Sequence, residues 1–162
     1  MLFESNSKHS KIFLVKVYAN LSQLVTALRN ITQKNGSHFQ LSIFGKLPQN
    51  DANLNTTLEE SSTTIRRKIS AALGKETQIS LLHHPEIGTL FIAGHLIPTF
   101  ITKIEDKQLG AFSAGLNGIF RGLGVDMKAY QYYMNHLKNG SYLLFIRSEM
   151  ESLSNIKSIL EA

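Results

Sequence analysis

The sequence predicts an α+β fold, a ferredoxin-like β-α-β-β-α-β sandwich with an inserted helix and a C-terminal helix. Apolar runs of strand length alternate with segments whose apolar residues recur at helical spacing. Asn-Gly pairs at 35–36 and 139–140 end two of these helical segments. The resulting order contains two β-α-β units, which predict an antiparallel four-stranded sheet with helices on one face.

The first β-α-β unit covers residues 11–44. Residues 11–18 are apolar, β-branched and aromatic, as in a strand with at least one covered face. Asn20 and Gln23 form a capping-box pair before a helix, and residues 39–44 alternate as in a half-buried strand. We expect a right-handed crossover between the two strands. The helical apolar positions are Leu21, Leu24, Val25, Leu28 and Ile31.

The segment 46–77 interrupts this pattern, and we interpret it as an insertion within a single domain, 1–162. Its first part is polar and rich in asparagine, as in a loop. Thr57 and Glu60 make a second capping box. A helix is therefore expected over about 57–73, ended by Gly74.

The second β-α-β unit follows the insertion. Asp126 is expected to cap a helix that ends at Asn139-Gly140. Ser148 and Glu151 make a third capping box, which predicts the closing helix. The predicted strands are 77–82, 88–93 and 142–146.

Small residues recur every fourth position in the glycine-rich segment before Asp126. We call Gly110, Ala114, Gly118 and Gly122 the small-residue stripe. On a helix these positions share one face, and each glycine there costs about 0.5–1 kcal/mol relative to alanine. The stripe therefore predicts a close packing contact, either with the chain's own sheet or with another molecule. Tyr132 is expected near solvent or at an interface.

Composition limits the function classes. The chain has no cysteine, which excludes disulfides and thiolate chemistry. A net charge of +5 permits anionic partners but does not require them. No secretory signal is visible, so a cytoplasmic protein is expected. The apolar segments 87–102 and 109–125 are short for a membrane span, which leaves peripheral membrane contact as an alternative.

No motif predicts a metal, phosphate or nucleic-acid site. His83 and His84 break the strand 77–82 and, as adjacent residues, would point in opposite directions. The glycines after 117 lack the Gly-Lys-Ser/Thr of a phosphate loop. Arg66-Arg67-Lys68 and several sheet aromatics give weak support for RNA binding, but the strand signature of an RNA-recognition motif is absent. Those aromatics are Phe39, Phe44, Phe91 and Tyr142.

The order of motifs in the second half is informative. Pro85-x-x-Gly88 precedes a strand ending in Ala93-Gly94, and Gly124-Val125-Asp126 follows the glycine-rich segment. This order resembles a family of small bacterial general-stress or heat-induced proteins with a domain of unknown function, over roughly residues 83–160. The resemblance implies a ferredoxin-like sheet and a stress-associated role, without catalytic residues to transfer. Further matching motifs are Tyr132-Tyr133 before Gly140 and Leu143-Leu144-x-Ile146.

Two hypotheses about function follow. In the first, a non-enzymatic, stress-associated protein acts through the small-residue stripe and Tyr132, by forming a homodimer or higher homo-oligomer or by docking on a protein partner. In the second, a dimeric ferredoxin-like domain binds or transforms a small ligand. The second predicts a concave apolar pocket with convergent polar groups, for which His95 and His83 are candidates. Neither assigns a catalytic, cofactor-binding or metal-ligating residue.

Overall fold

Five strands form one sheet in the order β1-β7-β2-β4-β3, and every neighbouring pair is antiparallel. The structure is a computed structural model that describes residues 11–34, 39–48 and 54–161. The strands of the sheet are β1 (Lys11–Tyr18), β2 (Gln40–Lys46), β3 (Ile79–His84), β4 (Gly88–Gly94) and β7 (Tyr142–Glu149). The helices are α1 (Leu21–Lys34), α2 (Leu54–Leu73), α3 (Ile97–Ile101), α4 (Ser113–Gly122), α5 (Met127–Lys138) and α6 (Met150–Glu161).

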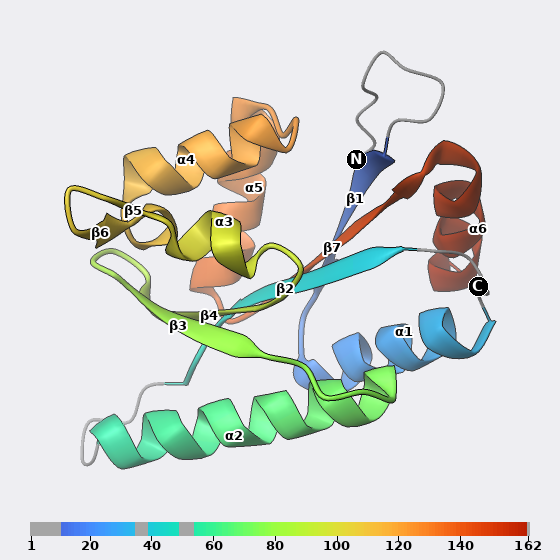
Figure 1. Cartoon of the computed structure of the whole chain (residues 1–162), viewed down its shortest axis with the longest axis horizontal. Coiled ribbons are helices and arrows are strands. Elements are labelled where there is room, and N and C mark those ends of the chain that lie inside the picture. The colour runs from blue at the N-terminus through green and yellow to red at the C-terminus, as the bar shows by residue number, and fades with distance from the viewer. Residues whose placement is uncertain (1–10, 35–38, 49–53, 162) are drawn as a thin grey trace.

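Helices cover both faces of the sheet. On one face, α1, α2 and α6 bury residues such as Leu28, Ile69 and Ile156 in one core cluster. On the other face, α3, α4 and α5 bury Phe100, Phe120 and Leu137 in a second cluster. Figure 1 shows this arrangement, with α4 and α5 on one side of the sheet and α1 and α2 on the other. The molecule therefore has three layers, helix, sheet and helix.

The α+β class is confirmed, whereas the ferredoxin-like arrangement is not. That arrangement predicts four strands with helices on one face, but the described sheet has five strands and is covered on both faces. Each β-α-β unit joins two parallel strands, β1 to β2 and β4 to β7, and the strands of one unit are antiparallel to those of the other. The two units cross the sheet in opposite directions, with their helices on opposite faces. The two crossovers consequently have opposite hands, and the right-handed rule holds for one of them.

The predicted insertion contributes to the core. Its helix, α2, begins at Leu54, three residues before the predicted cap at Thr57. Ile65 and Ile69 are buried against the sheet and α1. The chain then enters β3, an edge strand paired with β4. Residues 46–77 thus supply part of one helical layer.

Two predicted helix caps are present. Asn20 Oδ1 accepts a hydrogen bond from the Gln23 backbone N–H at 2.9 Å, while Gln23 Oε1 accepts one from Ala19 N–H at 3.3 Å. Asp126 Oδ1 accepts from Ala129 N–H at 2.8 Å, at the start of α5. The Asn35-Gly36 stop lies outside the described residues. Both caps satisfy backbone donors that the first helical turn leaves unpaired.

Two further predicted boundaries differ from the structure. β3 continues through His83 and His84, because His84 pairs with Gly88 across a tight turn. Ser148 does not cap α6, since it is a buried residue within β7 and the helix begins at Met150. In both cases pairing with a neighbouring strand extends the strand beyond the point that local sequence signals favour.

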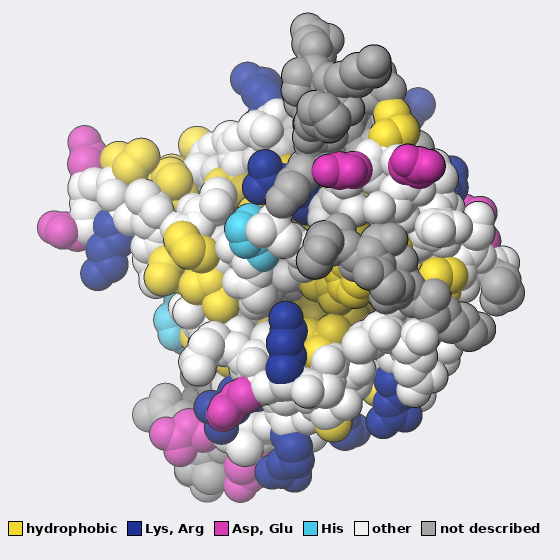
Figure 2. Space-filling model, turned by 45° about the vertical axis from the view of Figure 1, so that its right-hand side comes forward, with side chains coloured by type: hydrophobic (Ala, Val, Ile, Leu, Met, Phe, Trp, Pro, Cys, Tyr) yellow, Lys and Arg dark blue, Asp and Glu magenta, His cyan; other side chains and the backbone are white. Residues whose placement is uncertain are grey.

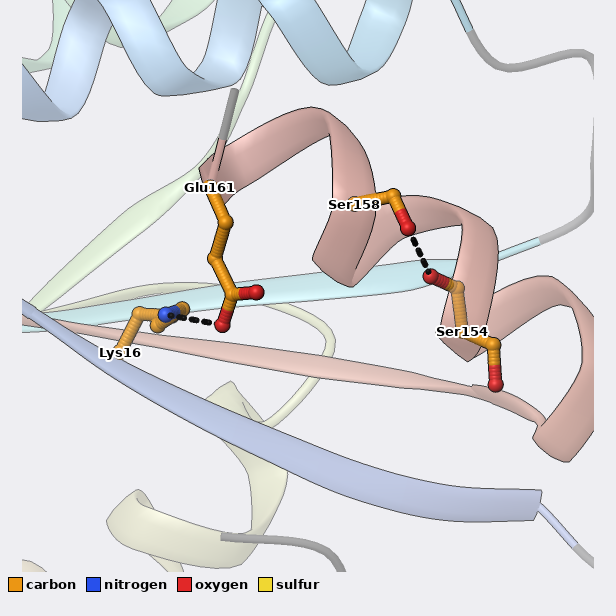
Figure 3. A network of polar contacts seen from close by, with 4 residues as sticks. All are labelled: Lys16, Ser154, Ser158 and Glu161. Atoms are coloured by element: carbon orange, nitrogen blue, oxygen red, sulfur yellow. Dashed lines mark hydrogen bonds and ion pairs between the residues drawn. The ribbon is translucent and has the colours of Figure 1, made fainter.

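An ion pair connects α6 to the edge strand β1. Lys16 Nζ on β1 lies 3.7 Å from Glu161 Oε1 at the end of α6 (Figure 3). Ser158 Oγ on the same helix donates to the Ser154 carbonyl oxygen at 3.2 Å. Both ionic side chains are partly exposed, so this pair contributes little to stability.

Candidate functional site

A pocket of about 520 Å³ opens at the end of the sheet where β2 begins and β4 ends. We call it the sheet-end pocket. Its lining combines the apolar side chains of Phe39, Leu41 and Leu73 with polar groups from α1, from β2 and from the connections after α2 and β4. The hollow with a hydrophobic floor near the centre of Figure 2 lies where this end of the sheet comes forward. The lining residues are Thr32, Phe39, Gln40, Leu41, Leu73, Lys75, Glu76, Thr77, Gln78, Gly94 and His95.

Backbone geometry around Gly94 shapes one wall of the pocket. Gly94 has a φ of +90°, a conformation that side-chain-bearing residues rarely adopt. The chain then turns back onto β2, where His95 N–H donates to the Leu41 carbonyl at 3.0 Å and Leu96 N–H donates to Ser42 Oγ at 2.8 Å. These bonds fix the backbone that carries His95 at the rim.

The opposite wall is the connection between α2 and β3. Gly74 ends α2 with a φ of +70°, as the sequence predicts. Thr77, which is buried, donates its backbone N–H to Ser70 Oγ at 3.0 Å. This bond holds the connection against the last turns of α2, and the exposed Lys75 and Glu76 lie on its outer side. The pocket therefore has charged groups of both signs at its edge.

Polar groups continue from the rim across the sheet. Arg147 on β7 lies directly opposite Gln40 on β2, and its Nη1 is 3.5 Å from His95 Nε2. The same guanidinium stands 5.6 Å from the centre of the Phe13 ring, within the range of a cation–π contact. Gln40 Oε1 and Arg147 Nε are buried without a hydrogen-bond partner among the described residues. Buried polar atoms of this kind are usually satisfied by water or by a bound ligand.

The structure separates the members of the small-residue stripe. Gly110 lies before the helix, in a 3-10 turn (η1, Leu109–Ala111), where a Cβ would meet Leu82 and Phe100. Ala114, Gly118 and Gly122 lie on the exposed face of α4. A Cβ at Gly118 or Gly122 would have open space around it. Only Gly110 therefore packs closely against the chain's own core.

Tyr132 is exposed, as the sequence predicts. Its side chain is 53% accessible on α5. Its ring lies 4.5 Å from that of His136, centre to centre, and 5.4 Å from that of Tyr133. Tyr133 is buried in the core, so the two neighbouring tyrosines have different environments. What Tyr132 contacts outside this chain stays a prediction.

The two adjacent histidines have opposite environments. His83 is exposed and its Nδ1 lies 3.1 Å from Thr89 Oγ1. His84 is buried, with only 4% of its surface accessible. Within the ranges that the structure describes, no three His, Asp or Glu side chains are grouped to hold a metal ion. His38 lies outside those ranges.

Three of the four sheet aromatics singled out in the sequence cannot form a stacking platform of the kind that RNA-recognition motifs use. Phe44, Phe91 and Tyr142 are all buried beneath helices, whereas bases must reach aromatic faces directly. Arg66-Arg67-Lys68 lies on the exposed side of α2. A solvated helix face explains these three charges without a ligand.

We expect His84 to make the free energy of unfolding sensitive to pH. Burial lowers the pKa of His84; the Glu86 carboxylate raises it and the Lys138 ammonium lowers it, with smaller effects. The unfolded chain takes up a proton near pH 6.5 while the folded chain resists it. The free energy of unfolding should therefore decrease as the pH falls below about 6.5.

Urea denaturation of wild type and His84→Asn, at about pH 7.5 and about pH 5.5, measures this dependence. Asparagine retains an acceptor for the Glu86 N–H that bonds His84 Nδ1 at 3.1 Å, but it does not titrate. We expect a flatter dependence in His84→Asn and the wild-type dependence in His83→Asn. Equal losses of stability in wild type and His84→Asn would contradict the assignment.

Comparisons with known proteins add no identification. The chain matches no protein-family model, no curated protein and no solved structure. The resemblance to bacterial stress proteins therefore stays a prediction. None of the helices that the structure describes is long and apolar enough to cross a membrane. Function must be argued from the geometry.

Proposed function

We propose that this chain binds a small organic molecule with an apolar body and a polar head group in the sheet-end pocket. The observation that carries the proposal is the pocket itself, about 520 Å³ with Phe39, Leu41 and Leu73 in its lining. Ligand sites in proteins are commonly 300–1,000 Å³ in volume, mostly apolar, with a few placed polar groups.

The polar groups define how such a ligand would lie. His95, Thr77 and Gln78 are on two walls of the pocket, and Lys75 is at its edge. An apolar body would remain on the side of Phe39 and Leu73, while the head group would reach the polar walls. Burying the apolar body would contribute roughly 25 cal/mol of binding free energy per Å² of apolar surface. The hydrogen bonds of the head group would fix the orientation of the ligand.

Anilinonaphthalene sulfonate, which has aromatic rings and an anionic group, is the probe for this proposal. Thr32 lines the pocket from the exposed side of α1. Thr32→Trp is expected to fill the pocket and weaken binding by at least about tenfold, or ~1.4 kcal/mol. A fluorescence titration measures the dissociation constant and the stoichiometry, which should be one probe per chain.

Gln33→Trp is the matched control. Gln33 is the next residue of the same helix, is exposed, and does not line the pocket. The Gln33→Trp variant should bind the probe with the wild-type dissociation constant. Equal binding by wild type and Thr32→Trp, or equal weakening in both variants, would overturn the proposal.

A second candidate function, self-association with another copy of this chain, is favoured by the open side of α4. Gly118 and Gly122 have open space where a side chain would stand, so no contact within the described chain offsets their cost to the helix. A second backbone could approach this face closely. Under this proposal the stress-associated role would depend on assembly and not on catalysis.

The Gly118→Leu variant tests assembly without disturbing the fold. Because the position is open and helical, leucine should fit and should favour the helix by about 0.5–1 kcal/mol. Sedimentation equilibrium is expected to give a dimer for wild type and a monomer for Gly118→Leu, with circular dichroism showing both folded. A monomeric wild type, or a dimeric variant of equal affinity, would rule out this contact.

A further inference from the structure

A second, smaller cavity lies away from the sheet-end pocket, between the β3–β4 turn and α5. It measures about 220 Å³, and we call it the His84 cavity. Its lining includes His84 at the end of β3, Glu86 from the turn, Tyr130 and Lys138 from α5, and Ser113 at the start of α4. None of these residues contributes to the proposed ligand pocket.

The hydrogen bonds of His84 fix which ring nitrogen carries the proton. Its Nδ1 accepts a hydrogen bond from the Glu86 backbone N–H at 3.1 Å. The neutral ring therefore carries its hydrogen on Nε2, which acts as a donor. Nε2 is buried and has no partner among the described residues. A buried donor without an acceptor is costly, and native structures generally satisfy such groups with water or a ligand.

Other donors surround the same cavity. Lys138 offers an ammonium group and Tyr130 a hydroxyl. No side chain caps the N-terminus of α4, where Ser113 lies, so the first backbone N–H groups of this ten-residue helix add positive potential. The Glu86 carboxylate opposes this potential, and Lys138 balances it. The group that complements these donors is one that only accepts hydrogen bonds.

We propose that the His84 cavity binds a small carboxylate, with one carboxylate oxygen accepting the hydrogen bond from His84 Nε2. A carboxylate has two acceptor oxygens and no donor, which matches a lining rich in donors. The volume suits a molecule of the size of acetate or propionate. Because Nε2 itself is buried, this hydrogen bond requires side chains that line the cavity to move aside.

Two substitutions at His84 test which ring nitrogen matters. His84→Asn retains an acceptor near the Nδ1 position and removes the Nε2 donor, whereas His84→Gln places an amide donor near the Nε2 position. Sodium acetate is titrated against sodium chloride at constant ionic strength, and NMR follows the imidazole signals together with the Glu86 and Ser113 backbone amides, which remain in the His84 variants. We expect saturable shifts at His84 and not at His83 in wild type. Acetate affinity should fall by about tenfold in His84→Asn and be largely retained in His84→Gln.

A pair on α5 keeps the proposal testable if the His84 variants fail to fold. Lys138 lines the cavity, whereas Lys128 is exposed on the same helix and does not. Lys138→Gln should weaken acetate binding, and Lys128→Gln should leave it unchanged. Non-saturating shifts, equal shifts at both histidines, or saturation by inorganic phosphate but not acetate would overturn the proposal. If water alone fills the cavity, the shifts on adding acetate will not saturate.

Discussion

Replacing Gly94 with alanine is expected to destabilise the protein by roughly 3 kcal/mol or more, because backbone strain and a collision combine there. The φ of Gly94 is +90°, which disfavours any side chain. A Cβ would also strike the carbonyl oxygen of Leu41 on the neighbouring strand. That oxygen accepts the His95 N–H bond at 3.0 Å. The substitution should thus separate β2 from β4 at the pocket.

Gly74→Ala is the matched control for strain without collision. Gly74 has a φ of +70° and no atom within contact distance of an added Cβ. Alanine there should cost roughly 1–2 kcal/mol, the usual penalty of this backbone region. Urea denaturation of both variants measures the difference. Equal losses would show that the Leu41 contact contributes nothing.

Phe120→Ala is expected to cost about 3–5 kcal/mol, the range for deleting a large buried aromatic side chain. Phe120 has no accessible surface. Its ring centre lies 5.4 Å from that of Tyr130, 6.4 Å from that of Tyr133 and 5.6 Å from that of Phe145. It therefore joins α4, α5 and β7, and its loss leaves a cavity in the middle of that layer.

Tyr132→Ala provides the comparison for this aromatic cluster. It removes a large ring from the same layer, but from its exposed surface. The expected loss is below about 1 kcal/mol. Thermal denaturation of both variants shows which substitution lowers the melting temperature more. A Phe120→Ala variant as stable as Tyr132→Ala would contradict the packing described for α4.

Local signals in the sequence predicted individual elements well. Asn20 and Asp126 each bond a backbone N–H of the first helical turn, and such bonds depend on neighbouring residues alone. The positions Leu24, Leu28 and Ile31 are all buried, as their helical spacing predicts. Capping and periodicity are local properties, so the sequence expresses them directly.

The three-layer arrangement has a signal that the ferredoxin-like interpretation missed. Leu90–Ala93 and Leu143–Ile146 are continuous apolar runs, and every residue in them is buried. Successive side chains of a strand point to opposite faces. Continuous apolar strands therefore predict a sheet covered on both sides. The half-buried pattern of residues 39–44 suggested instead that one face was open.

The lining of the sheet-end pocket and the position of the small-residue stripe depend on tertiary packing, which local sequence signals do not express. The sheet-end pocket joins residues from α1, β2 and the ends of α2 and β4, which only the sheet order brings together. Of the two histidines that the sequence offered as polar groups of a ligand pocket, His95 lines this pocket and His83 does not. In α4, Leu116, Ile119 and Phe120 occupy the core, so the small residues on the other side of the helix face outward. Spacing predicted one shared helix face for all four positions, but Gly110 lies outside α4 and the other three face away from the core.

A two-dimensional NMR titration with anilinonaphthalene sulfonate shows residue by residue whether a ligand binds in the sheet-end pocket. The amides of Leu41, Thr77 and Gly94 report on three walls of the pocket. We expect saturable shifts concentrated at these amides, reduced in Thr32→Trp and unchanged in Gln33→Trp. Shifts that do not saturate, or that centre on α4 and α5, would contradict binding in this pocket.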